Sequence, residues 1–239
     1  TFMGYDVSFH PISPDEIQEW YFTPITWIQQ GQEEKVLALA AQHGIENFYA
    51  EKYLDTLRVG AETEPDELFD KSHGFYIAVV QGFFRDYYYT RGSSFSFLME
   101  EKPEYARYFT PWAQVVPTAL PNPAKNQIIE NYCSGVYLSP NQVLQILRDL
   151  EQEPKVLEDL EKHWSDGQFA VLKKALTAAA ELGTGLLEAT EVVEPNPLHP
   201  NESTCYSNLF HCDRDGVYLY IDMAMKQIAQ AMEQNKSDP

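Results

Sequence analysis

The most aromatic stretch of the chain, residues 72–92, restricts the possible fold more than any other part of the sequence. On a helical wheel at about 100° per residue, its aromatic and aliphatic side chains cover an arc of roughly 200°. One face carries Tyr76, Val80, Phe83 and Tyr87. Only a narrow stripe with Gln81 and Arg85 carries polar groups. Such a wide apolar arc is typical of a buried helix, so we expect a central core helix at about residues 73–91.

Signals for helices and short strands surround this stretch. Ser13-Pro14 and Ser139-Pro140 each follow a short strand and precede Glu16 or Gln142 at the capping-box position. Further helices are expected at residues 33–43, 45–59, 143–150, 153–164 and 168–182, and a last one at 223–234, capped by Asp222. Strands are expected at residues 4–12, 135–138, 185–193 and 217–221, and residues 93–98 fit a strand or a loop. The sequence therefore predicts a helix-dominated α+β fold with several helices around the aromatic one.

A proline-rich connector marks the one candidate domain boundary. Residues 111–123 contain four prolines, which preclude a regular helix over this length. The sequence is consistent with an N-terminal α+β lobe at residues 1–120 and a C-terminal α+β lobe at 121–239. A single continuous domain is the other possibility.

The net charge of −19 is the strongest bulk property of the chain. The acidic residues are spread evenly, with 18 in residues 1–120 and 18 in residues 121–239. An evenly acidic surface repels nucleic-acid phosphates and anionic membrane surfaces, so we expect neither as a partner. The same charge attracts a basic protein and speeds its association at low salt.

Cysteine usage points to a reducing compartment. Cys133, Cys205 and Cys212 make an odd number without the spacing of a disulfide framework. The chain shows no signal peptide and no apolar segment long enough to cross a membrane. We therefore expect a cytoplasmic protein, of the acidic kind common in bacteria. The sequence leaves its oligomeric state open.

One polar cluster near the C-terminus contains residue types that bind metals: His199, Cys205, His211 and Asp213. Its spacing matches no zinc finger, since neither Cys-x-x-Cys nor His-x-x-x-His occurs. A structural role at the edge of a sheet is the preferred interpretation, and no cofactor is predicted. The cluster is nevertheless the best candidate centre for a hydrolase or metal-dependent enzyme.

A second candidate site lies between the first strand and the aromatic helix. A cleft there could bring together His10, His73, Gln81 and Arg85. A guanidinium on a mostly buried helix needs either an acidic partner or a bound anion. Pairing of Arg85 with an internal acid is the preferred interpretation, and the cleft is the alternative.

Two function classes follow from these patterns. The first is a non-catalytic acidic protein that binds and neutralises a basic protein partner, for example a bacterial toxin-immunity protein. It is favoured by the even acidity, the tyrosine content and the lack of a catalytic motif. The alternative is the hydrolase or metal-dependent enzyme with a site that the sequence does not reveal.

Overall fold

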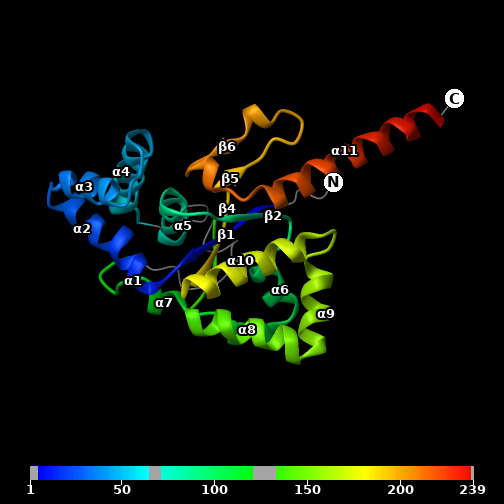
Figure 1. The fold of residues 1–239 in the computed structure, drawn as a ribbon, viewed down its shortest axis with the longest axis horizontal. Helices are drawn as coiled ribbons and strands as arrows, with labels where there is room; N and C mark the ends of the chain where they lie inside the picture. Colours follow the sequence, from blue (N-terminus) through cyan, green and yellow to red (C-terminus); the bar gives the residue numbers. More distant parts are fainter. Residues whose placement is uncertain (1–4, 65–70, 121–132, 238–239) are drawn as a thin grey trace.

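A computed structural model describes residues 5–64, 71–120 and 133–237, with side chains up to residue 234. This part of the chain forms a helix-dominated α+β fold around a small antiparallel sheet (Figure 1). The predicted helix-dominated α+β class is therefore confirmed, but the central aromatic helix expected at about residues 73–91 is not. Of the proline-rich connector, residues 111–120 are described, and residues 121–132 lie outside the described ranges.

The main sheet has the strand order β2-β1-β4-β3. Its strands are β1 (Asp6–Ile12), β2 (Tyr88–Arg91), β3 (Ser134–Leu138) and β4 (Gly185–Thr190). A separate two-stranded sheet pairs β5 (Val193–Glu194) with β6 (Thr204–Cys205). The main sheet takes β1 and β2 from residues 1–120 and β3 and β4 from residues 121–239. The main sheet therefore contains strands from both predicted lobes, and a cut at residue 120 would separate β1 and β2 from β3 and β4.

Helices cover both faces of the main sheet (Figure 1). The first face carries α1 (Pro14–Ile17), the π-helix η1 (Gln18–Phe22), α2 (Thr23–Gln29), α3 (Glu33–Gln42), α4 (Asn47–Glu62), α5 (His73–Phe84) and α7 (Trp112–Val115). The second face carries α6 (Phe95–Glu101), the 3-10 helix η2 (Pro103–Tyr108), α8 (Pro140–Gln152), α9 (Pro154–His163) and α10 (Gln168–Leu182). The 3-10 helices η3 (Pro200–Glu202) and η4 (Leu209–His211) and the long α11 (Arg214–Ser237) follow β4.

Strand β1 shows why this sheet is buried on both sides. Val7 and Phe9 point into the core on the second face, whereas Ile12 joins the core on the first face. The alternating polar residues Ser8 and His10 are also buried. The predicted period of two is present, but the polar face of this strand is covered by protein instead of facing water.

The aromatic segment forms a shorter helix than expected. Helix α5 ends at Phe84, and Tyr88–Arg91 form strand β2 at the edge of the sheet. Tyr87 therefore lies beyond the end of the helix, although the helical wheel over residues 73–91 predicts it on the apolar face. Tyr87 is instead fully buried in a small cluster with Tyr89, Val193 and Cys212.

Two further expectations are wrong. Residues 93–98 belong largely to helix α6, whose first turn Ser94 caps by accepting a hydrogen bond from the Phe97 amide. Residues 217–221 are not a strand, because α11 already begins at Arg214, well before the expected cap at Asp222. β-branched and aromatic residue types favour strands only where a sheet edge is available to them. Here Val217 and Tyr220 pack as helix residues against the Tyr87 cluster.

No helix within the described ranges is both long and apolar enough to span a bilayer.

Candidate functional site

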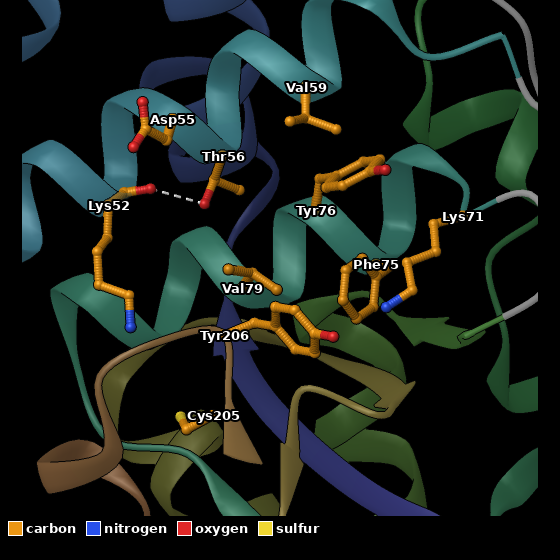
Figure 2. A pocket seen from close by; sticks show the side chains of 10 residues that line it. All are labelled: Lys52, Asp55, Thr56, Val59, Lys71, Phe75, Tyr76, Val79, Cys205 and Tyr206. Atoms are coloured by element: carbon orange, nitrogen blue, oxygen red, sulfur yellow. Dashed lines mark hydrogen bonds between the residues drawn. The ribbon is translucent and has the colours of Figure 1, made fainter.

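A pocket of about 540 Å³ lies between α4 and α5 and is closed on one side by the end of β6 (Figure 2). Helix α4 contributes Lys52, Thr56 and Val59 to its lining. Helix α5 contributes Phe75, Tyr76 and Val79, and the chain after β6 contributes Tyr206. This volume is in the range of pockets that hold small organic ligands.

Helical periodicity explains why these side chains share one space. Lys52 and Thr56 are four residues apart on α4, as are Phe75 and Val79 on α5. The Thr56 hydroxyl donates a hydrogen bond of 2.8 Å to the Lys52 carbonyl, so its methyl group is free to face the cavity. Figure 2 shows Thr56 and Val79 facing each other across the pocket.

Lys71 forms part of one wall of the pocket. Its ammonium nitrogen lies 4.0 Å from the ring centre of Phe75 and 4.5 Å from that of Tyr206. The same nitrogen is 3.9 Å from a carboxylate oxygen of Glu191. The two rings and the acid together hold Lys71 in place, and Lys71 in turn holds Tyr206 against α5.

Lys52 lies at the other side of the pocket and has no acidic partner among the described residues. Figure 2 shows its side chain running down from α4 toward the β6 side. Within the described ranges no carboxylate pairs with its ammonium group, whose closest aromatic ring is Phe48, with the centroid 5.6 Å away. The neighbouring Asp55 carboxylate is bound by Arg58 at 2.7 Å. The acid nearest in sequence is thus already neutralised by another cation.

The cysteine at the pocket is a poor nucleophile. The Tyr87 hydroxyl lies 3.4 Å from the Cys205 sulfur. Burial raises the pKa of the Cys205 thiol, and burial with nearby acidic groups raises the pKa of the Cys212 thiol to about 12. Since the thiolate is the reactive form, neither residue is prepared for covalent catalysis.

Many exposed apolar residues lie in the C-terminal part of the chain, and one of them, Tyr206, also lines the pocket. Seven of the twelve exposed large hydrophobic residues in the described chain fall within residues 198–232. We call them the C-terminal apolar surface: Leu198, Tyr206, Leu209, Phe210, Tyr218, Met225 and Met232. Phe210 alone is 81% exposed.

Helix α5 holds the part of this surface around Phe210 in position. The Ser207 hydroxyl donates to the Val79 carbonyl at 2.7 Å, and the His211 Nδ1 donates to the Gly82 carbonyl at 2.8 Å. A Cβ atom at Gly82 would lie 2.2 Å from the Ser207 hydroxyl oxygen, so only glycine permits this approach. Phe210 is therefore displayed from a segment that is fixed at both sides.

Helix α11 extends the surface away from the body of the protein (Figure 1). Its first turn packs so closely on β2 that a Cβ atom at Gly216 would overlap the Tyr89 carbonyl oxygen. Beyond that turn, apolar residues recur with spacings of three and four. They are Tyr218, Ile221, Met225, Ile228 and Met232. The far part of this stripe has little protein to pack against, as the exposure of Met225 and Met232 shows.

The first cleft predicted from the sequence is only partly assembled. His10 Nδ1 donates to the Gln81 side-chain oxygen at 2.7 Å, and His10 Nε2 accepts from the Ser8 hydroxyl at 2.8 Å. Burial lowers the pKa of His10 to about 3, so this ring is neutral. Arg85 pairs with Glu16 and its guanidinium lies 4.8 Å from the centre of the Trp20 ring.

His73 lies apart from His10 and Gln81. Its Nδ1 hydrogen bonds to the Tyr21 hydroxyl at 2.7 Å, and burial lowers the pKa of His73 to about 4. Its other ring nitrogen, Nε2, has no hydrogen-bond partner among the described residues. The structure thus joins His10 to Gln81 and directs Arg85 and His73 to internal partners of their own.

The residues proposed as metal ligands are separated as well. His211 binds the Gly82 carbonyl, Cys205 lies near Tyr87, and Asp213 pairs with Lys174. His199 precedes η3, and its backbone amide donates to Asn196 at 3.0 Å. In the described ranges no three His, Cys, Asp or Glu side chains are grouped as a metal site requires.

Sequence reasoning missed the pocket because its walls come from three distant segments. Lys52, Lys71 and Tyr206 share no motif and no common spacing. The one sequence feature that could have drawn attention to Lys52 and Lys71 is the small number of basic residues, since only 17 residues are Lys or Arg.

No protein-family model, curated protein or solved structure matches this chain.

Proposed function

We propose that this chain is a non-catalytic binding protein that captures a basic protein partner through the C-terminal apolar surface. The observation that carries the proposal is the concentration of seven of twelve exposed large hydrophobic residues in residues 198–232. Aromatic and methionine side chains are enriched at protein interfaces, and this surface contains both kinds. Arg85 and His10, two of the candidate site residues from the sequence, are bound to internal partners.

Charge selects the partner. The chain carries a net charge of −19, and Glu202 and Asp222 lie within the apolar surface in sequence, whereas Asp213 and Asp215 pair with Lys174. A basic partner gains from this field during its approach, and the apolar contacts then slow its dissociation. A toxin-immunity pair in a bacterial cytoplasm is a concrete form of this proposal. Such an inhibitor has to bind tightly and needs no catalytic group.

The aromatic helix has a definite part in this proposal. Helix α5 supplies the Val79 and Gly82 carbonyls that anchor Ser207 and His211 on either side of Phe210. We infer that α5 is the central scaffold on which the binding surface is organised, although it contributes no partner contact of its own.

The test is capture of a basic protein by the immobilised full chain from a lysate of the native organism. We compare the natural chain with a Phe210→Ser, Met225→Ser double variant. Leu144→Ser is the matched control, because Leu144 is an exposed hydrophobic residue on α8 outside the surface. Loss of two interface anchors should weaken binding by at least about a hundredfold, whereas the control should bind normally.

Ionic strength provides the second half of the test. Once a captured protein is identified, its association rate should fall steeply as salt rises from about 0.01 M to 0.15 M, because the Debye length shortens from about 30 Å to 8 Å. The proposal fails if no basic protein is retained at low salt. It also fails if the double variant retains the partner as well as the natural chain does.

A further inference from the structure

We infer that the pocket between α4 and α5 binds a small organic acid, with the carboxylate at Lys52 and an apolar body of phenylalkyl size against Val79 and Tyr76. This site is additional to the proposed protein-binding function and takes a ligand of the opposite charge. The inference depends on three properties of the pocket, which are its lining, its uncompensated cation and its size.

The lining suits an apolar body. Phe75 and Val79 of α5 form the floor, and Val59 and the face of Thr56 close the space from α4 (Figure 2). Tyr206 forms the remaining wall, fixed by Lys71 as described above. Most of the lining surface is apolar, so an apolar ligand that enters the pocket removes its own apolar surface from water, which is favourable.

The cation at Lys52 selects an acidic head group. The chain has 36 acidic and 17 basic residues, yet the residues that line this pocket include two lysines and only one acid, Asp55. Lys71 is already engaged by two rings and Glu191. Lys52 pairs with no described carboxylate, and Arg58 holds the adjacent Asp55. Lys52 is therefore the group that can bind a ligand carboxylate without giving up an existing ion pair.

Size and overall charge favour a small monoanion over an acidic peptide. A volume of about 540 Å³ lies in the range of pockets that bury one drug-sized molecule. A polyacidic segment would bring several negative charges toward a chain of net charge −19. A single carboxylate brings only the charge that Lys52 neutralises.

The experiment uses three probes that differ only in the head group: 4-phenylbutyrate, 4-phenylbutanol and 4-phenylbutylamine. Binding to the full chain is followed by calorimetry in the millimolar range and by chemical-shift changes in backbone amide NMR spectra. We expect 4-phenylbutyrate to bind about tenfold more tightly than the alcohol, and the amine to bind more weakly than either. The largest shifts should fall on α4, α5 and residues 205–206.

Two variants and one control separate head-group recognition from general stickiness. Lys52→Met keeps the length of the side chain and should reduce the preference for the acid over the alcohol to about onefold. Val59→Trp fills the pocket from an exposed position and should weaken both probes about tenfold or more. Lys173→Met removes an exposed lysine elsewhere and should leave the preference at about tenfold. Circular dichroism verifies that each variant is folded.

Three results would overturn the inference. They are the absence of binding by all three probes, equal affinity for the acid and the alcohol in the natural chain, and a preference for the acid that survives Lys52→Met. Shifts confined to α11 would also overturn it, because they would place the probe on the C-terminal apolar surface.

Discussion

We expect the natural chain to lose folding stability as pH rises above about 5. Replacing Glu188 by glutamine should remove this loss. Glu188 lies in the middle of β4 and is 1% exposed. Its carboxyl group faces the start of α6 and accepts hydrogen bonds from the Phe95 amide at 2.6 Å and the Ser96 hydroxyl at 2.9 Å. Two opposing forces therefore act on one buried acid, because burial favours the protonated form and the donors favour the carboxylate.

Burial is the larger of these forces. It raises the pKa of Glu188 from 4.5 to about 7, despite the hydrogen bonds from Phe95, Ser96 and Val136. The folded protein thus binds more protons than the unfolded chain between these two values, and stability falls as pH rises through that window. At about 1.4 kcal/mol per pH unit, the whole effect is about 3 kcal/mol. About 2.5 kcal/mol of it should be lost between about pH 5 and 8.

The assay is urea unfolding of the natural chain and of the Glu188→Gln variant between pH 5 and 8. Glutamine has the same shape and does not titrate, so subtracting the two curves isolates the contribution of this one carboxyl group. The stability of the natural chain relative to the variant should fall by about 2.5 kcal/mol across the range. Glu181→Gln is the matched control, since it makes the same chemical change at an exposed position on α10.

A flat difference for Glu188→Gln would refute the reasoning. Such a result would show that the donors at the start of α6 outweigh burial and keep the carboxylate ionised, because a carboxylate with a depressed pKa titrates below the range of the assay. Gly135 leaves room for the Glu188 carboxyl group. A Cβ atom there would lie 2.5 Å from a Glu188 carboxyl oxygen, a distance at which one of them has to move.

Two further predictions concern buried groups. His10 has a pKa lowered to about 3 by burial, so the unfolded chain binds more protons below about pH 6.5; acidification from pH 7 to 4 should cost the natural chain about 3 kcal/mol relative to His10→Gln. Equal acid sensitivity of the two proteins in chemical unfolding would contradict this. Gly216→Ala should destabilise the chain by about 2 to 4 kcal/mol, because its Cβ overlaps the Tyr89 carbonyl oxygen; an unchanged thermal midpoint would contradict that close approach.

Local signals in the sequence predicted the helices well where the ends are chemically marked. The expected helix at residues 168–182 coincides with α10, which Gly183 ends in a left-handed conformation. Ser13 and Ser139 both form the capping boxes predicted for them. These features depend on neighbours within a few residues, so the sequence contains all the information they need.

Prediction failed where distant contacts decide the structure. Residues 217–221 have the composition of a strand, but Gly216 lets the chain approach β2 as a helix and bury Val217 and Tyr220. The aromatic helix ends at Phe84 because the next residues complete the edge of a sheet with β1. Nothing within residues 72–92 indicates that partner.

The polar stripe of the aromatic helix shows how far the sequence could identify a site. The proximity of His10 to Gln81 was predicted, and the two side chains are 2.7 Å apart. The preferred interpretation of Arg85, an internal ion pair, agrees with its contact to Glu16. The pocket and the exposed apolar surface were not predicted, because both are built from residues that are ordinary in their local sequence.

Charge divides the proposed binding region into two parts that suit different ligands. In the proposed complex, the net charge of −19 would attract a basic protein to the C-terminal apolar surface, whereas Lys52 would repel basic groups at the pocket. Tyr206 belongs to both parts, with one side against Lys71 and an exposed fraction of 47%. A partner that contacts Tyr206 must therefore place an apolar or acidic group beside the pocket and its basic groups farther along α11. This arrangement fixes the orientation of the partner, because the reverse orientation brings like charges together.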